Sequence, residues 1–333
     1  MLYSDSTRVV HVNEVANVPS TLVTQAQLEG KAWSLQRIPA GKGHPAKVIS
    51  SRLIHFFQWQ QLRHDADIIH LHYATNGYYG WGRKPFVLHL HGSDIRRDWQ
   101  KPGLRQVITK SIREADAVLC ATPDLLPWVR TLRPDAQWIP NPLPLEFFTP
   151  ADVEVVAGKV VFATRLDETK SIDLLVGLAA FLVQAGIEVH GLDWGSGAAR
   201  MAEVGVILHP LMPLPEFAKF LGSADFVIGQ LQFPALSMTD YQALALGARL
   251  LCAASAEHVP AFTVVADGES ADFSEGAAQM LPRDPQVLAE FVIGELASGP
   301  HSEQKQRAQR DWVFKYHHPA NVVAKLEAVY RSL

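Results

Sequence analysis

Residues 234–247, PALSMTDYQALALG, combine small and hydroxylic side chains with an apolar helical pattern that ends at Gly247. The apolar run from Ala224 to Ile228 precedes them, so the segment predicts a strand, a loop and a helix N-terminus. The first amides of such a helix have no intrahelical acceptor and carry a partial positive charge, so they can hold a phosphate or diphosphate. The alternative is a capping box formed by Thr239 and Gln242, which needs no ligand.

Two apolar runs end in His-Leu-His: DIIHLHY at Asp67 to Tyr73 and PFVLHLH at Pro85 to His91. Strand alternation puts His89 and His91 on the same side. In open parallel sheets, ligands bind at the carboxyl ends of strands, where His72 and His91 would lie. Zinc is the alternative reading of these histidines. However, the two strands need not be neighbours and no cysteine or His-x-x-x-His helix accompanies them, so we expect no metal.

Short β-branched runs alternate with helical patterns in the first part of the chain. Strands are predicted at residues 9–15, 32–38, 67–73, 85–91 and 117–121, and helices at 20–28, 52–63, 104–115 and 124–131. The loop at 16–20 reads ANVPS, so it lacks the G-x-G-x-x-G fingerprint of dinucleotide-binding oxidoreductases. Four prolines between Pro140 and Pro150 exclude regular structure and predict a linker.

The same alternation then begins again. Strands are predicted at residues 159–163, 187–192, 206–209, 224–228 and 249–253, and helices at 171–185, 215–221 and 280–296, with one or two more in 302–333. We therefore predict an α/β protein with two Rossmann-like, doubly wound domains at 1–150 and 151–314. The segment 315–333 is predicted as a helix that packs back on the first domain.

Size and composition indicate a soluble globular protein. With 333 residues, 48% hydrophobic and 19% charged, the chain suits two domains, and no apolar run reaches the length of a membrane span. The first residues show no secretion signal, and Cys120 and Cys252 lie far apart in apolar settings. We therefore expect a cytoplasmic protein with reduced thiols. A pI near 6.4 argues against nucleic acid as a partner.

The two parts of the chain differ in charge. The first 150 residues hold 17 Lys and Arg against 12 Asp and Glu, whereas the rest hold 13 against 22, so the net charges are +5 and −9. Much of the basic excess is on and before one predicted amphipathic helix, in Arg96, Arg97, Lys101, Arg105, Lys110 and Arg113. A cationic helix can attract an anionic acceptor or lipid headgroups at the inner membrane face, and a solvated helix face explains the charges equally well.

Several motifs, taken in order, resemble the retaining glycosyltransferases of family 4. The resemblance covers nearly the whole chain and rests on DIIHLH, VLHLHGSDIR, ADAVLCATPDLL, IPNPLPLEFFTP, FATRLDETKSIDLLV and QALALG. It implies the GT-B fold, in which two Rossmann-like domains face a cleft. It also implies transfer of a sugar from a nucleotide-sugar donor to an acceptor hydroxyl with retained configuration, without a metal or other cofactor. The acceptor class stays open between a glycan, a lipid-linked acceptor and a small molecule.

The resemblance assigns roles to individual residues. Arg165 and Lys170 match the pair that grips the donor diphosphate, and a guanidinium and an ammonium in one loop suit this charge. His91 matches the active-site histidine. The remaining expected donor-binding residues are Gly195, Leu211, Met212, Ser237, Met238, Thr239 and Gln242, and base recognition is expected from the backbone near Leu211 and Met212. The acceptor-side candidates are Asn17, His72, Tyr73 and Asp94.

The chain departs from the family at the two glutamates expected with seven residues between them, where Pro234 and Gln242 stand. A glutamine carbonyl can accept one ribose hydrogen bond, although it does so more weakly than a carboxylate. A sugar-nucleotide-binding or partner protein with little or no catalysis is therefore the main alternative. An NAD-dependent oxidoreductase is a further alternative, but the glycines from Gly191 to Gly197 lie late in the chain and no suitable acidic residue follows them.

Overall fold

The computed structural model of the chain describes residues 3–39, 44–82, 85–149, 153–233, 235–253, 264–266 and 279–333. These residues form two compact units: unit 1 comprises Met1–Pro144 and Tyr316–Leu333, and unit 2 comprises Leu145–Lys315. The unit boundaries therefore fall after residues 144 and 315, whereas the sequence predicted boundaries after residues 150 and 314. Each unit is a parallel β-sheet with helices on both faces, which is the predicted fold class.

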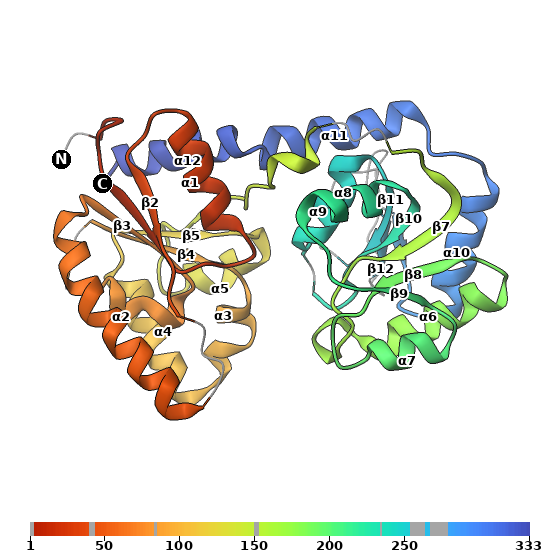
Figure 1. Ribbon diagram of the computed structural model, residues 1–333, viewed down its shortest axis with the longest axis horizontal. Helices are drawn as coiled ribbons and strands as arrows, with labels where there is room; N and C mark the ends of the chain where they lie inside the picture. Colours follow the sequence, from red (N-terminus) through yellow and green to blue (C-terminus); the bar gives the residue numbers. More distant parts are fainter. Residues whose placement is uncertain are drawn as a thin grey trace. The chain divides into compact units, whose positions relative to one another are not determined.

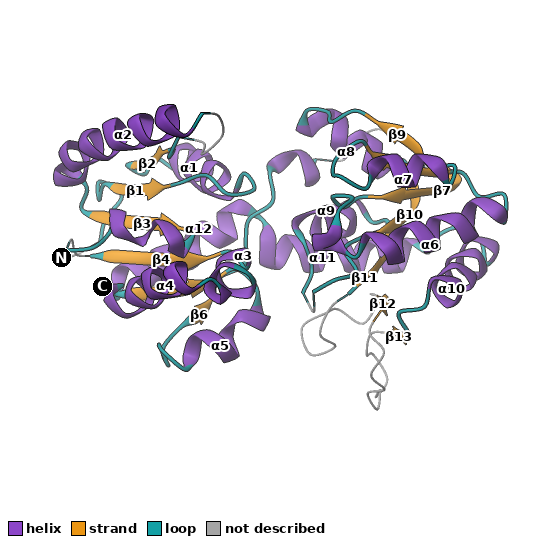
Figure 2. Cartoon of the chain, turned by 90° about the horizontal axis from the view of Figure 1, so that it is seen from below, coloured by secondary structure: helices purple, strands orange, loops and turns teal. Residues whose placement is uncertain are grey.

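Unit 1 contains a six-stranded parallel sheet in the order β2-β1-β3-β4-β5-β6, whose arrows point the same way (Figure 2). Its strands are β1 (Val9–Val12), β2 (Trp33–Gln36), β3 (Ile68–His72), β4 (Phe86–Leu90), β5 (Ala117–Cys120) and β6 (Gln137–Trp138). Its helices are α1 (Val18–Leu28), α2 (Pro45–Asp65), α3 (Ser93–Arg96), α4 (Pro102–Glu114), α5 (Leu126–Arg130) and α12 (Pro319–Arg331). Short 3₁₀ helices are η1 (Ala74–Tyr79), η2 (Asp98–Gln100) and η3 (Pro123–Leu125).

The two faces of this sheet differ in chemistry. One face is an apolar core, where Leu71 and Leu88 of the sheet pack in one cluster with Trp59 of α2 and Ile108 of α4. Helices α1 and α12 lie on the other side (Figure 1). Every residue of β3 and β4 is buried, as expected of parallel strands covered on both faces.

Unit 2 contains a seven-stranded parallel sheet in the order β13-β12-β11-β10-β7-β8-β9. Its strands are β7 (Val156–Phe162), β8 (Val189–Leu192), β9 (Ile207–His209), β10 (Ala224–Ile228), β11 (Arg249–Cys252), β12 (Val264–Ala266) and β13 (Gln279–Leu281). Its helices are α6 (Ile172–Gln184), α7 (Ala198–Glu203), α8 (Leu214–Gly222), α9 (Met238–Leu246) and α10 (Pro285–Ala297), together with η4 (Leu145–Phe147) and η5 (Glu168–Lys170). Helix α11 (Glu303–His317) runs across the unit boundary, so the segment 302–333 forms two helices.

Two predicted helices have different bounds. The segment 280–296 is not one helix, because β13 ends at Leu281 and α10 begins at Pro285. Asp284 caps α10 by accepting hydrogen bonds from the amides of Gln286 and Val287 at 2.9 and 3.0 Å. Helix α2 starts at Pro45 rather than Arg52, since proline suits the first helical position. Within the described part of the chain, no helix is both long and apolar enough to cross a membrane.

Candidate functional site

The strand order of unit 2 reverses beside β7. Strand β8 lies on one side of β7 and β10 lies on the other, so the connections leave in opposite directions. In open α/β sheets, ligands bind outside the carboxyl ends of strands at such a switch point. The loop after β7 carries Arg165 and Lys170, and the loop after β10 leads to the N-terminus of α9.

Lys170 and Ser171 bring these two loops together. The Lys170 ammonium lies 5.7 Å from the ring centroid of Phe233, and the hydroxyl of Ser171 bonds to the side-chain oxygen of Gln232. Ser171 is also the N-cap of α6 and has φ of 60°. Two contacts made by neighbouring residues thus hold the loop after β7 against the loop after β10.

The Arg165 side chain is positioned by its own loop. Its Nε lies 2.5 Å from Oδ2 of Asp167, its Nη2 donates to Oγ1 of Thr169 at 2.8 Å, and its guanidinium lies 5.8 Å from the ring centroid of Trp194. The side chain is 37% exposed, so it remains accessible to an anion. The sequence assigned no role to Asp167 or Thr169; Asp167 also bonds the amide of Thr169 and so shapes the turn.

Gly195 allows the loop after β8 to pack against the loop after β7. Its φ is +127°, and a Cβ there would lie 2.3 Å from the carbonyl oxygen of Leu166. Leu166 in turn donates its amide to the carbonyl of Trp194 and accepts from the amide of Gly197, both at 2.8 Å. Any side chain at 195 would push these two loops apart.

The N-terminus of α9 is capped by Ser237, not by the predicted pair Thr239 and Gln242. Ser237 and Asp240 form the capping box: the Ser237 amide donates to Oδ2 of Asp240 at 2.6 Å, and the Asp240 amide donates to the Ser237 hydroxyl at 3.3 Å. The amides of Met238 and Thr239 have no acceptor among the described residues. Two donors at the positive end of the helix therefore stay available to an anion.

Asp240 is a buried carboxyl beside these amides. Burial raises its pKa to about 6, while bonds from Ser237 and the nearby Lys170 ammonium oppose the shift. Because the carboxylate is fully buried and used in the cap, it does not contact solvent directly. Because Asp240 interacts electrostatically with Lys170, the loop after β7 lies near the N-terminus of α9.

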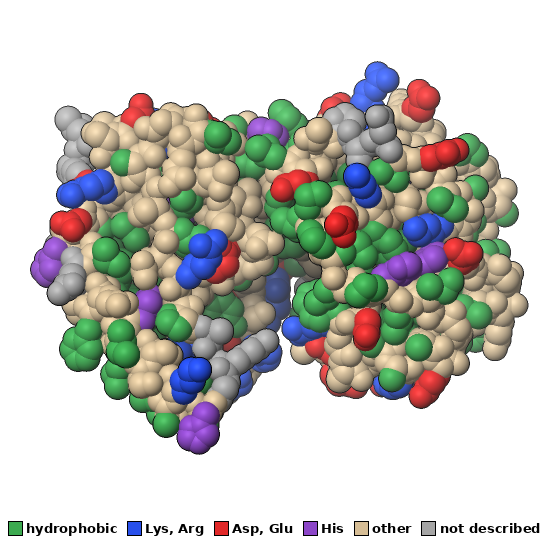
Figure 3. Space-filling model, in the orientation of Figure 1, with side chains coloured by type: hydrophobic (Ala, Val, Ile, Leu, Met, Phe, Trp, Pro, Cys, Tyr) green, Lys and Arg blue, Asp and Glu red, His purple; other side chains and the backbone are tan. Residues whose placement is uncertain are grey.

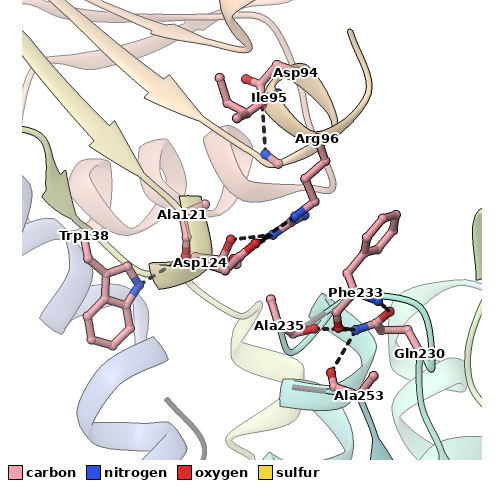
Figure 4. Close-up of polar contacts among 12 residues, drawn as sticks. Asp94, Ile95, Arg96, Ala121, Asp124, Trp138, Gln230, Phe233, Ala235 and Ala253 are labelled. Atoms are coloured by element: carbon pink, nitrogen blue, oxygen red, sulfur yellow. Dashed lines mark hydrogen bonds and ion pairs between the residues drawn. The ribbon is translucent and has the colours of Figure 1, made fainter. Parts of the chain in front are cut away.

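Gln230 shapes the loop after β10, a role that no sequence pattern indicates. Its side-chain nitrogen donates to the carbonyls of Phe233, Ala235 and Ala253 at 2.6, 2.5 and 3.0 Å, as Figure 4 shows. Its side-chain oxygen accepts from the amides of Gln232 and Phe233 at 3.0 and 2.9 Å. One buried side-chain amide thus satisfies five backbone groups of a loop whose backbone does not pair with a strand.

The remaining donor-side residues are placed as follows. Gln242 is buried, at 7% exposure, and no described residue bonds its side-chain amide. Pro234, the other departure from the family, lies outside the described residues. Leu211 and Met212 follow the edge strand β9, and their backbone groups form no hydrogen bond with any other described residue.

In unit 1, Asp94 organises the turn that follows β4. Its carboxylate accepts from the amides of Ala74, His91, Gly92 and Ile95 at 3.2, 3.3, 2.9 and 3.1 Å, and Figure 4 shows the bond from Ile95. The residue is fully buried, so its carboxylate is used inside the turn that carries His91. Burial raises the pKa of Asp94, and the four amides oppose that shift.

Four of the six basic residues noted in the sequence form ion pairs, one of which is the exposed pair of Lys110 with Glu114, 3.6 Å apart on α4. Arg96 binds Asp124 at 2.7 Å (Figure 4). It also donates to the hydroxyl of Thr122 at 2.9 Å. Arg97 and Lys101 both contact Asp98, at 3.2 and 2.8 Å. The exposed basic face is therefore narrower than predicted and is centred on α4, where Arg105, Lys110 and Arg113 lie.

The other acceptor-side candidates lie in different settings. Asn17 is exposed, with φ of 61°, and its carbonyl accepts from Ser20 and Thr21 at the start of α1. The hydroxyl of Tyr73 donates to Asp98 at 2.7 Å, and burial raises the pKa of Tyr73. His72 is fully buried within the sheet.

The histidine strands are neighbours: His72 of β3 pairs with His89 of β4, and His70 pairs with His11 of β1. Two trios, His11/His70/His72 and His72/His89/His91, bring their nitrogens within 4.8 Å of one another. In the first trio, the rings of His70 and His72 are stacked, only 6° from parallel. Tetrahedral ligation would require these rings to turn.

Comparison with known proteins supports the resemblance. Residues 26–147 match the family model of glycosyltransferase family 4. A search of curated proteins found no match. Among solved structures, sucrose-phosphate synthase from Thermosynechococcus elongatus has a TM-score of 0.72 at 15% identity, with 98% of each chain covered. HepE from Anabaena, solved with UDP-glucose, has a TM-score of 0.71 at 12% identity, covering 98% of this chain and 100% of HepE.

A glycosyltransferase from Rickettsia africae has a TM-score of 0.63 at 12% identity, with 99% of each chain covered. Identities this low establish the fold alone. The predicted resemblance is confirmed: the chain has the GT-B fold of these proteins and is similar in sequence, over residues 26–147, to glycosyltransferase family 4.

Proposed function

We propose that the protein is a retaining glycosyltransferase that moves a sugar from a nucleoside-diphosphate sugar to an acceptor hydroxyl. The observation that supports this most is that the loop carrying Arg165 and Lys170 lies at the switch point of unit 2, with Lys170 near the N-terminus of α9, where the amides of Met238 and Thr239 have no acceptor among the described residues. Two cations and two unpaired amides suit a diphosphate. UDP-glucose is the first donor to test, because HepE was solved with it.

In the proposed reaction, the bond between the anomeric carbon and the diphosphate oxygen breaks as the acceptor oxygen bonds to the same face of that carbon. Arg165, Lys170 and the α9 amides stabilise the negative charge that develops on the leaving diphosphate. A leaving phosphate oxygen takes the acceptor proton, so no carboxylate pair of the glycosidase type is needed. His91 of unit 1 is assigned to the active site, and no metal or other cofactor is required.

The remaining donor and acceptor contacts are proposals of the same kind. The backbone of Leu211 and Met212 would bind the base, Gln242 would bind a ribose hydroxyl, and Gly195 would let the loop approach the donor. Asn17 and Tyr73 are the acceptor-side candidates with exposed or half-buried side chains. His72 and Asp94, which are buried, would act there through the turns that they support.

Replacing the two cations tests the function directly. With UDP-glucose and a panel of GDP-, ADP-, dTDP- and CMP-linked sugars, Arg165→Ala and Lys170→Ala should each lower turnover by about 100-fold or more, because each removes charge stabilisation from the leaving group. Arg200→Ala is the matched control, since Arg200 pairs with Asp173 on the exposed surface of the same unit at 2.7 Å. Unchanged rates in the first two variants, with the fold intact, would remove this mechanism.

The sequence departure at Gln242 supports one alternative, a protein that binds sugar nucleotides without transferring the sugar. Isothermal titration calorimetry would then detect binding of a nucleoside diphosphate, while no donor in the panel would be hydrolysed and no sugar would be transferred. A thermal-shift screen with the free nucleotides and their sugars ranks the ligands for both cases, because stabilisation grows with affinity.

We further propose a cytoplasmic protein that contacts the inner membrane face through unit 1. Helix α2 exposes Ile49, Leu53, Ile54 and Phe57 at 60%, 53%, 59% and 69%. Hydrophobic side chains gather on the surface over this helix (Figure 3). Helix α4, which packs on the same apolar cluster of the sheet, carries the exposed basic residues. Apolar and basic side chains on two helices that pack on the same apolar cluster suit an anionic lipid surface.

A further inference from the structure

Five histidines line one face of the unit 1 sheet: His11, His70, His72, His89 and His91. The first four are fully buried, and neighbouring rings are stacked or tilted against one another with centroids 4.5 to 5.5 Å apart. The sheet face would be apolar in an ordinary core. A row of polar rings in its place requires that their nitrogens be satisfied, because an unpaired buried polar group is costly.

Three of the rings form one hydrogen-bonded chain. Nδ1 of His11 lies 2.9 Å from Nε2 of His72, and Nδ1 of His72 lies 2.9 Å from Nε2 of His91. His70 and His89 are outside the chain, since His70 bonds the Tyr330 hydroxyl at 2.5 Å and His89 bonds the carbonyl of Ile139 at 3.3 Å.

The three rings of this hydrogen-bonded chain are neutral, so each ring carries a proton on only one of its two nitrogens. Burial lowers the pKa of His11 to about 3 and keeps the pKa values of His72 and His91 well below 6.5. The other histidines add to the shift, because each would repel a second positive charge. Each ring therefore donates through one nitrogen and accepts through the other.

The two ends of the chain decide the direction of donation. Nδ1 of His91 and Oδ1 of Asn141 are both buried without a partner within hydrogen-bond distance, yet the Asn141 side chain raises the pKa of His91 in the way an acceptor does. A longer contact from a His91 N–H to this oxygen explains both facts. The opposite direction would leave an N–H at Nε2 of His11, a buried atom with no partner.

We propose that His72 is a positioning residue: it donates from Nδ1 to Nε2 of His91 and so fixes His91 as the neutral tautomer with its proton on Nδ1. His11 supports His72 by donating to its Nε2. With Nε2 occupied, His91 can act only as a hydrogen-bond donor through Nδ1, toward Asn141 or toward an oxygen of a bound ligand. It is not a general base. The catalytic meaning of this tautomer rests on the proposed function.

Nitrogen NMR of ¹⁵N-histidine-labelled protein tests the tautomer without any substrate. We expect the His91 signals of the unmodified protein to show a protonated Nδ1 and an unprotonated Nε2 between pH 6 and 8. His72→Asn, whose amide nitrogen can replace Nδ1 as donor, should keep this pattern, and His72→Leu should shift the His91 proton toward Nε2. The control is His70→Leu combined with Tyr330→Phe, which removes a bonded pair on the same face and should leave His91 unchanged.

A proton on Nε2 of His91 in the unmodified protein would overturn the proposal, even if no variant folds. An unchanged tautomer in a folded His72→Leu protein would overturn it too. The activity arm compares His91→Asn with His91→Gln: Asn places a donor near Nδ1 and should keep at least tenfold more activity than Gln. If the NMR result is as expected and no donor sugar is turned over by any protein, the proposed function fails while the positioning role stands.

Discussion

Gln242 is the residue at which the chemistry of this chain and that of the family it resembles differ most directly. It is buried one turn into α9, with no bond to its amide from any described residue. Asp240, two residues earlier, already places a carboxyl with a raised pKa in the same turn. A second carboxylate would therefore be costly without a ligand that donates to it, and a neutral amide avoids this cost.

Changing Gln242→Glu should tighten binding of UDP-glucose about fivefold, because a hydrogen bond to a charged acceptor is worth about 1 kcal/mol more than one to a neutral acceptor. Calorimetry at pH 7.5 measures the affinity. The unliganded variant should unfold at a lower temperature than the unmodified protein. Weaker binding would instead mean that the donor's ribose is held away from position 242.

The details around α9 show where residue-level prediction from the sequence stops. The pattern predicted a capped helix near residue 238, and this is what the structure contains. It did not distinguish Thr239 with Gln242 from Ser237 with Asp240, because both pairs have the spacing of a capping box. Which pair forms the capping box depends on Asp240, whose buried carboxylate also accepts from the amide of Gln230. The side chain of Gln230 makes five hydrogen bonds that hold the loop, and such bonds leave no periodic pattern in the sequence.

At the scale of elements, helices α2 and α4 carry the proposed membrane contact. Unmodified protein should float with vesicles that contain anionic lipid and should be released as salt rises, because the basic residues of α4 act through screened charges. Changing both Leu53→Gln and Phe57→Gln should abolish flotation, since these apolar side chains are more than half exposed and provide the buried area.

The matched control for this test is Leu28→Gln, an exposed apolar side chain on α1 rather than α2. It should leave flotation unchanged. Equal flotation of all three proteins, or flotation that is independent of anionic lipid, would exclude this face as the membrane contact.

Elements with a strong local signal were predicted well. Strands β3 and β4 were expected within a residue or two at each end, because continuous apolar runs followed by polar loops have few other interpretations. Strand β13 was instead read as the start of a helix, since three residues are too few for a period to show. The convergence of the loops after β7, β8 and β10 depends on strand order, which no local pattern encodes.

At the scale of the whole molecule, the neutral histidines make stability depend on pH. Burial lowers the pKa of His11 to about 3 and of His89 to about 4, and keeps those of His70, His72 and His91 well below 6.5. An unfolded chain takes up these protons first, so the stability is present above about pH 6.5 and is lost as pH falls toward 3. Asp94 and Asp240, whose pKa values are raised by burial, act in the opposite direction but are fewer than these histidines.

Each histidine contributes about 1.4 kcal/mol per pH unit in this window. Thermal unfolding followed at pH 7.5, 6.5 and 5.5 should show a steep loss of stability below pH 6.5. The double variant His70→Leu with Tyr330→Phe removes one titrating group together with its partner and should give a shallower dependence. A melting temperature that is constant from pH 7.5 to 5.5 would show that these rings are not neutral in the folded protein.

The contact between α12 and the histidine face also constrains how the chain can fold. His70 and Tyr330, which bond directly, are separated by 260 positions, and all of unit 2 is encoded between the two segments of unit 1. On the ribosome, β1 to β6 are made long before the helix that covers one of their faces. Unit 1 can therefore be completed only after α12 has been synthesised. Until then, its buried imidazoles stay open to water and to protons.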